Sequence, residues 1–180
     1  MKNKKVYLRA LESDDYKISI EWRQDPEIWS MLVGRRYFVS EQIEKQWVES
    51  TYNNSNQVTL AICDSITNTY IGNISLKNID FFNKSASFAI LVGNKDYWSG
   101  GYGTQATRLL LDHAFIDLGL ERVQSIILSD NIGSVKMHEK CGFMQEGVLR
   151  NAVFKNGKMQ DLILMSVLSQ DFLKSLNNLA

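Results

Sequence analysis

Glycine is concentrated in one short stretch of the chain, where Gly100, Gly101 and Gly103 lie within four positions. The stretch follows an apolar run at 88–92 and precedes a helical pattern that starts near Thr104. Glycine lets backbone N–H groups approach a ligand closely, because no Cβ is in the way. The start of a helix adds unpaired N–H groups and the positive end of the helix dipole. The pattern therefore predicts a site for a phosphate or pyrophosphate group, and a tight turn that binds nothing is the alternative.

The residues around these glycines restrict the kind of phosphate ligand. A nucleotide P-loop requires Gly-Lys-Ser/Thr, whereas Gly103 is followed directly by Thr104, without the lysine. The stretch 101–106 fits the dinucleotide fingerprint G-x-G-x-x-A, and Asp130 ends the next predicted strand. A doubly wound dinucleotide-binding sheet needs several strand–helix–strand crossovers, however, and the pattern predicts only one. A dinucleotide-binding redox domain is therefore kept as the alternative that the topology disfavours.

The elements that must position this site follow from the hydrophobic pattern. Apolar and alternating runs predict strands at 6–11, 57–63, 69–77, 85–92, 122–129, 143–154 and 159–168. Helix signals predict helices after Ser13, at Pro26, after Ser40, from 104 to 118 and from Asn131 to Gly142. Asn156-Gly157 predicts a two-residue hairpin turn. This order predicts a single α/β (α+β) domain, 1–180, with a mixed sheet that is antiparallel at both ends and has one parallel pair in the middle.

Charge and composition exclude several classes of protein. Lys plus Arg and Asp plus Glu both number 20, so no basic excess indicates a nucleic-acid partner. We find neither a secretory signal pattern nor an apolar stretch long enough to span a membrane. Cys63 and Cys141 are far apart and are expected to be reduced, buried thiols. We therefore expect a cytoplasmic protein with no membrane partner, and the scattered histidines and cysteines predict no metal site.

Four blocks of sequence, in order, resemble the GNAT superfamily of acetyl-CoA-dependent N-acetyltransferases. Trp98-Ser-Gly-Gly-Tyr-Gly103 resembles the phosphate-binding element Q/R-x-x-G-x-G/A of that family, with Trp98 in place of Gln or Arg. The segment 131–143 resembles the N-x-x-S…E-K-x-G-F block, and segments 22–27 and 146–161 also match. The likeness covers nearly the whole chain. It points to the branch that contains ribosomal-protein alanine N-acetyltransferases and spermidine N-acetyltransferases.

This resemblance implies a GNAT-type fold and the use of acetyl-CoA as cosubstrate. In that fold a mostly antiparallel sheet is flanked by helices, and its parallel strand pair splays apart to admit the pantetheine arm. Backbone groups of 90–92 would face this arm, and N–H groups of 99–104 would hold the pyrophosphate. The residues assigned to the cofactor in this way are Ile90, Leu91, Val92, Trp98, Ser99, Gly100, Gly101, Tyr102, Gly103, Thr104, Asn131 and Ser134.

Transfer of the acetyl group to a primary amine requires few groups from the protein. The amine must lose a proton before it attacks, because a free alkylamine has a pKa of about 10. The negative charge that develops on the acetyl oxygen needs a donor, for which an N–H group near Leu91 or Val92 is the candidate. In many relatives a tyrosine four residues before the glycine of the Gly-Phe pair protonates the departing thiolate, and His138 occupies that position here. His138 is therefore a candidate general acid; water as the acid, and a histidine that only packs on its helix, are the alternatives.

The general base and the acceptor are left open by the sequence. Some polyamine-directed relatives carry Glu on the strand before the cofactor loop, where this chain has Ser87. Glu21, Asp80 and Asp161 are the candidate carboxylates for the general base. The acceptor is expected to be a small-molecule or peptide amine: a protein N-terminus, an amino sugar, a polyamine or another small amine. A catalytically silent CoA-binding protein is a further alternative, and a homodimer is compatible with the resemblance.

Overall fold

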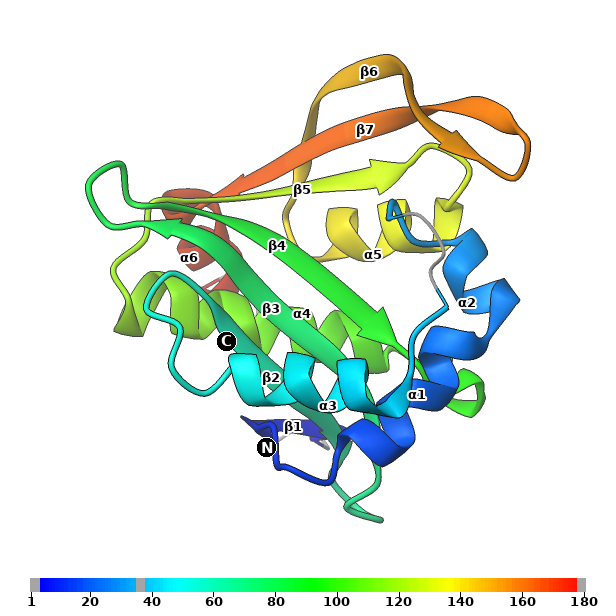
Figure 1. Cartoon of the computed structure of the whole chain (residues 1–180). Coiled ribbons are helices and arrows are strands. Elements are labelled where there is room, and N and C mark those ends of the chain that lie inside the picture. Colours follow the sequence, from blue (N-terminus) through cyan, green and yellow to red (C-terminus); the bar gives the residue numbers. More distant parts are fainter. Residues whose placement is uncertain (1–3, 35–37, 178–180) are drawn as a thin grey trace.

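The structure of the chain is a computed structural model that describes residues 4–34 and 38–177 (Figure 1). Within these residues, seven strands form one sheet in the order β1-β2-β3-β4-β5-β7-β6. The strands are β1 (Val6–Ala10), β2 (Val58–Asp64), β3 (Tyr70–Asp80), β4 (Ser85–Val92), β5 (Arg122–Leu128), β6 (Met144–Lys155) and β7 (Lys158–Leu168). All seven coincide with runs that the hydrophobic pattern predicts.

The pair β4–β5 is parallel, and the other neighbouring strands of the described sheet pair antiparallel. The parallel register is short and ends where Ser87 pairs with Gln124. Beyond that point β4 stays paired with β3, and β5 stays paired with β7. The two strands therefore diverge toward their C-terminal ends (Figure 1). The mixed, mostly antiparallel sheet with one splayed parallel pair is confirmed.

Helices cover both faces of the sheet, with α1 and α3 on one side and α4, α5 and α6 on the other (Figure 1). The helical elements are α1 (Tyr16–Gln24), α2 (Pro26–Ser30), α3 (Glu41–Ser50), the 3₁₀ turn η1 (Lys95–Tyr97), α4 (Tyr102–Asp112), the π-helical turn η2 (His113–Asp117), α5 (Ile132–Lys140) and α6 (Ser169–Asn177). In the part of the chain that the structure describes, no helix combines the length and the apolar character that a membrane crossing requires.

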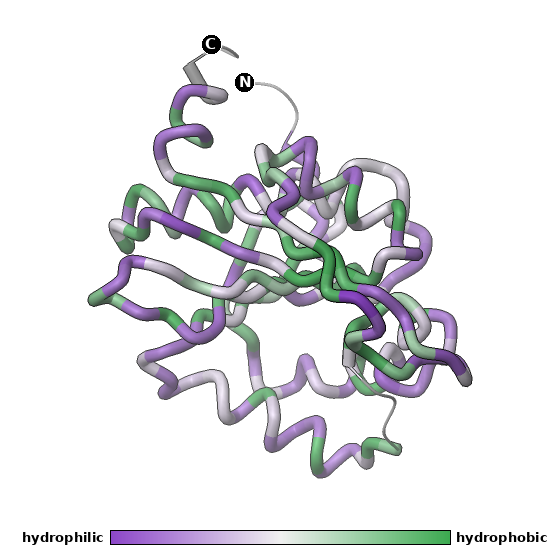
Figure 2. The backbone as a smooth tube through the Cα atoms, turned by 90° about the horizontal axis from the view of Figure 1, so that it is seen from above, coloured by the Kyte–Doolittle hydropathy of each residue, from purple (hydrophilic) through white to green (hydrophobic). Residues whose placement is uncertain are grey.

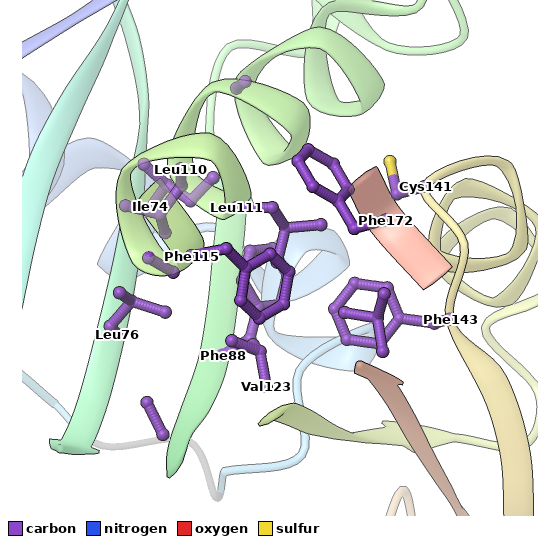
Figure 3. Close-up of a cluster of buried hydrophobic side chains, with 14 of the residues drawn as sticks. Ile74, Leu76, Phe88, Leu110, Leu111, Phe115, Val123, Cys141, Phe143 and Phe172 are labelled. Carbon is purple, nitrogen blue, oxygen red and sulfur yellow. The ribbon is translucent and has the colours of Figure 1, made fainter. Parts of the chain in front are cut away.

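The larger hydrophobic core lies between the sheet and the helices α4 to α6 (Figure 3). Leu110, Leu111 and Phe115 form the apolar face of the α4–η2 segment, and each is almost fully buried. Burying one such side chain stabilises the fold by about 1.5–3 kcal/mol. Cys141 lies in this core and Cys63 lies in a smaller one under α1 and α3, both as free thiols. Figure 2 shows the same distribution, with apolar segments in the central strands and hydrophilic ones along the outer helices.

The beginning of α1 differs from its prediction. Ser13 does not cap this helix, because residues 13–15 form a turn and α1 begins at Tyr16. The Asp15 carboxylate accepts the N–H of Glu12 (2.8 Å) and pairs with Arg9 (2.7 Å). The acidic residue therefore fastens the turn to β1 instead of stabilising the helix start.

Helix α6 is absent from the predicted elements. Its Phe172 is buried, and its ring centroid lies 5.4 Å from that of Phe115 in η2. This contact joins the C-terminal helix to the larger core. Packing against a distant part of the chain stabilises this short helix.

Candidate functional site

The glycine stretch forms a tight turn that leads directly into α4. Ser99 and Gly101 adopt the left-handed conformation, with φ angles of 60° and 82°. Gly101 is the N-cap of α4 and offers no side-chain oxygen to the helix. The first backbone bond of the helix runs from the N–H of Gln105 to the carbonyl of Gly101 (3.0 Å). The N–H groups of residues 102–104 therefore have no partner within the helix, which is the arrangement that binds phosphate.

Trp98 anchors this turn to the end of β4. Its indole Nε1 donates a hydrogen bond to the carbonyl of Val92 (2.7 Å), and its backbone N–H bonds to the carbonyl of Lys95 (3.0 Å). The side chain that departs from the Gln/Arg pattern thus fixes the position of the turn relative to the strand.

Lys5 places a positive charge beside the turn. Its Nζ donates to the carbonyl of Gly100 (2.7 Å) and lies 5.4 Å from the centroid of the Tyr102 ring. The backbone N–H groups of Lys5 and Val6 both bond to Oε1 of Gln105, at 2.6 and 3.0 Å. Sequence reasoning missed Lys5, because no local pattern indicates that the start of β1 lies next to a turn 95 residues away.

Beyond the end of its pairing with β5, the strand β4 presents backbone groups without a strand partner on that side, where the carbonyl of Val92 accepts the indole N–H of Trp98. Gly93 donates its N–H to β3 (2.9 Å), and Leu91 is the β4 partner of Asn73. Alternate residues of a strand direct their backbone groups to opposite sides. Those of Ile90 and Val92 therefore face the space between the diverging ends of β4 and β5, which is called the gap below. The expected contact with a pantetheine arm thus fits Ile90 and Val92. The backbone groups of Leu91 face β3, so this geometry does not favour its expected contact with the arm, which stays a prediction.

Two glycines allow neighbouring elements to come close to this part of β4. A Cβ on Gly72 of β3 would lie 2.2 Å from the carbonyl oxygen of Leu91. A Cβ on Gly93 would lie 1.9 Å from the ring of Trp22 in α1. Both positions therefore require glycine, and the close packing holds the C-terminal half of β4 in place.

His138 is buried between α5 and β5. Its Nδ1 donates to the carbonyl of Ser134 (2.8 Å), so Nε2 accepts the hydroxyl of Ser125 (3.0 Å). The ring packs edge-on against Phe88 and Phe143, with centroids 5.3 and 4.8 Å away. Burial lowers the pKa of His138 to about 4. The imidazole is therefore neutral near pH 7, and its geometry favours the packing alternative over the general acid.

Asn131 links the end of β5 to α2. Its Oδ1 accepts the N–H of Ser134 (3.0 Å) and caps α5, for which the sequence offers Asp130 or Asn131, while its Nδ2 donates to the carbonyl of Met31 (3.0 Å). The side-chain amide is thus bound within the chain at both ends. Each of these atoms can form a further hydrogen bond, so the expected contact of Asn131 with the pantetheine arm stays a prediction.

The three candidate carboxylates lie in different places. Asp80 accepts the N–H of Asn83 in the β3–β4 turn (2.8 Å), at the end of β4 opposite the gap, so its geometry does not fit a general base. Asp161 lies beside the end of β5, where its carbonyl accepts the N–H of Ser129 (3.1 Å). Glu21 is exposed on α1. Among the residues with a described position, no group of three or more His, Cys, Asp or Glu side chains is arranged to hold a metal ion.

A family model described as an acetyltransferase (GNAT) domain matches residues 5–144. The chain belongs to the GNAT acetyltransferase family. The spermidine N(1)-acetyltransferase of Vibrio cholerae is 25% identical over 171 residues, which cover 95% of this chain and 97% of the relative. The putative ribosomal N-acetyltransferase YdaF of Bacillus subtilis is 34% identical over 101 residues, or 56% of this chain and 55% of the relative.

Solved structures show the same GNAT fold. The crystal structure of spermidine N-acetyltransferase from Vibrio cholerae in complex with CoA and spermine superposes with a TM-score of 0.88 at 25% identity, and covers 95% of this chain and 99% of that one. This GNAT domain therefore transfers an acetyl group from acetyl-CoA to a primary amine. The family membership excludes the dinucleotide-binding redox domain.

Proposed function

We propose that acetyl-CoA binds across the diverging ends of β4 and β5, and that the acceptor amine enters from the face covered by α1 and α3. One observation carries the proposal. The parallel pairing ends where Ser87 meets Gln124, and the free N–H groups of residues 102–104 lie at the turn that follows the same strand. An unpaired strand edge and an anion-binding helix start are thus joined by one short connection. Acetyl-CoA needs both features, because its pantetheine arm can pair with the strand edge and its diphosphate can bind at the helix start.

The residues around the gap have complementary roles. Acetyl-CoA supplies an acetyl group that is activated by its thioester bond. The backbone N–H groups of 99–104 and the ammonium group of Lys5 hold the diphosphate. The backbone of Ile90 pairs with the amides of the pantetheine arm. The N–H group of Val92, which faces the gap, donates to the negative charge that develops on the acetyl oxygen.

The acceptor amine must lose a proton before it attacks the thioester. Only about 0.1% of a free alkylamine is neutral at pH 7, so binding must favour the neutral form or water must remove the proton. Glu21 and Asp161 stay as the candidate bases, and the Asp161 carboxylate already accepts the N–H of Asn151 (2.8 Å). The neutral ring of His138 keeps α5 and β5 in position, so water is left to protonate the departing thiolate.

Release of free CoA, followed with a thiol reagent, tests this function. The panel contains spermidine and spermine, because a relative acts on spermidine and its structure contains spermine. It also contains a short peptide with a free N-terminus, an amino sugar and a simple alkylamine. Acetyl-CoA should be consumed in the presence of at least one amine. Tight acetyl-CoA binding without CoA release from any amine would instead identify a catalytically silent protein.

A further inference from the structure

Lys155, the last residue of β6, is a buried cation. Only 6% of the residue is exposed. Its Nζ donates to the carbonyl oxygens of Leu32 (2.5 Å) and Gly34 (2.6 Å), and it lies 5.8 Å from the centroid of the Trp29 ring. Two carbonyls and an indole face form an environment that suits a positive charge. The ammonium group thereby fastens the segment that follows α2 to the β6–β7 hairpin.

The charge of Lys155 has no anionic partner within the described residues. None of the ion pairs found there involves this side chain, and its two hydrogen bonds use two of its three N–H donors. Buried charges in proteins are normally paired. A buried cation that keeps a donor available is therefore suited to an anionic group that comes from outside the chain.

A second cation lies near the same tryptophan. The guanidinium group of Arg23 is 5.8 Å from the centroid of Trp29 and 4.9 Å from that of Trp47. Its Nε pairs with the buried carboxylate of Glu44 (3.1 Å), which also accepts the hydroxyl of Ser19 (2.6 Å). The negative charge of Glu44 is thus already compensated. The ammonium group of Lys155 therefore remains as a buried positive charge beside Trp29 that no described carboxylate compensates.

The wall made by α1, α2 and α3 borders the acceptor side of the gap. The carbonyl of Met31, one residue before Leu32, accepts the side chain of Asn131 at the end of β5. On the same wall, Trp47 packs in one cluster with Leu91 of β4. Figure 1 shows α2, the start of α5 and the β6–β7 turn at the edge of the sheet where β4 and β5 end. The charge of Lys155 is therefore held next to the opening through which the acceptor must pass.

We propose that Lys155 is a specificity-determining residue, and that it favours an acceptor whose amine is accompanied by a carboxylate over a polyamine. The inference rests on the proposed function, because it concerns the acceptor of that reaction. The remaining N–H donor of Lys155 forms a charge-assisted hydrogen bond with the carboxylate of such an acceptor. A second ammonium group, as in a diamine or a polyamine, is repelled by the same charge.

Three acceptors of similar length and different end groups test this preference: 5-aminopentanoate, pentylamine and 1,5-diaminopentane. We expect kcat/KM to fall in that order in the wild type, with about a tenfold difference or more between the first and the last.

Lys155→Met removes the charge and retains much of the length of the side chain. We expect this variant to remove the differences in kcat/KM among the three acceptors and to leave the KM for acetyl-CoA unchanged. Lys158→Met is the matched control, because Lys158 lies across the same hairpin with 65% of its side chain exposed and a 3.5 Å pair with Asp130. This variant should retain the order. If Lys155→Met fails to fold, Lys155→Gln, which removes the charge and keeps an N–H donor, is measured with the same three acceptors.

The outcomes separate this inference from the proposed function. A wild type that prefers the diamine overturns the role of Lys155 and leaves the acetyltransferase function intact. An equal loss for all three acceptors in Lys155→Met also overturns it, since Lys155 would then only hold the segment after α2. Absence of CoA release with these amines and with the wider panel would contradict the proposed function itself.

Discussion

Gly101 and Gly103 lie in the same turn but are subject to different constraints. The φ angle of Gly101 is 82°, in the region that disfavours any Cβ, although the space around a Cβ there is open. Gly103 has no such φ angle, and a Cβ on it would lie 3.6 Å from Val92 and 3.7 Å from Ile90, which are ordinary contacts. Backbone conformation therefore requires glycine at the first position, whereas the second has room for a methyl group.

Gly101→Ala should lower the free energy of unfolding by about 1–2 kcal/mol, because an alanine in the left-handed region is strained. It should also weaken acetyl-CoA binding, since relief of the strain moves the N–H groups of residues 102–104. Gly103→Ala should change the stability by less than about 0.5 kcal/mol. Urea unfolding and titration calorimetry with acetyl-CoA measure both effects. Equal losses in the two variants would contradict the assignment of the strain to Gly101.

The depressed pKa of His138 predicts a loss of stability in weak acid. The unfolded chain takes up this proton below pH 6.5, the ordinary value, whereas the folded chain does so only near pH 4. The stabilisation is therefore complete above pH 6.5 and is lost as the pH falls toward 4, by about 3 kcal/mol in total. Urea unfolding at a series of pH values measures this loss. His138→Gln should remove this part of the pH dependence.

Turnover of His138→Gln separates the two interpretations of this residue. A neutral ring that positions α5 and β5 predicts turnover at pH 7.5 within a fewfold of the wild type. A general acid predicts a loss of turnover of about a hundredfold or more with the same affinity for acetyl-CoA.

Glu146 provides an internal reference for the stability measurements in acid. Its bond to Arg122 lowers the pKa of its carboxyl group to about 2. Its contribution to stability is therefore lost only at lower pH, from 4.5 down to 2.

Among the elements, β3 has the most direct influence on the geometry of the gap. A methyl group on Gly72 would lie 2.2 Å from the carbonyl oxygen of Leu91, so Gly72→Ala must push β4 away. We expect a loss of stability of about 2 kcal/mol or more and a large loss of turnover. Gly147→Ala is the control, because a Cβ there meets no atom within 4 Å. Wild-type turnover in a stable Gly72→Ala variant would show that the position of β4 does not matter.

The elements that are fixed by local signals could be predicted from the sequence. The hairpin at Asn156 and Gly157 follows from residue types that tolerate positive φ, and the angles are 52° and 80°. The glycine turn before α4 follows from the close approach of backbone N–H groups that glycine allows, and its Gly101 also adopts a positive φ. The contacts of Lys5 with Gly100 and of Lys155 with Leu32 could not be found, because they join positions 95 and 123 residues apart. Side-chain burial, which decides the protonation state of His138, is also a property of the folded chain alone.

At the scale of the whole molecule, binding of acetyl-CoA should raise the melting temperature. A ligand at about 100 times its Kd stabilises the folded state by about 2.7 kcal/mol, which is a shift of roughly 5–10 °C for a domain of this size. NADH should produce no comparable shift, because the site lacks the remaining parts of a dinucleotide fold. Differential scanning fluorimetry with both ligands, and with free CoA, measures this difference. A shift with NADH alone would contradict the assignment of the glycine turn.

The short β4–β5 ladder divides the sheet into two leaves that are joined at one end. Within the first leaf, Ala89 and Leu91 are tied to β3, whereas the amide protons of Ile90 and Val92 face the gap without a strand partner. Hydrogen exchange measured by NMR should therefore alternate along β4, slow at 89 and 91 and fast at 90 and 92. Acetyl-CoA should slow the second pair. The cosubstrate then acts as the missing strand between the two leaves and completes the hydrogen bonding that the protein alone leaves unfinished.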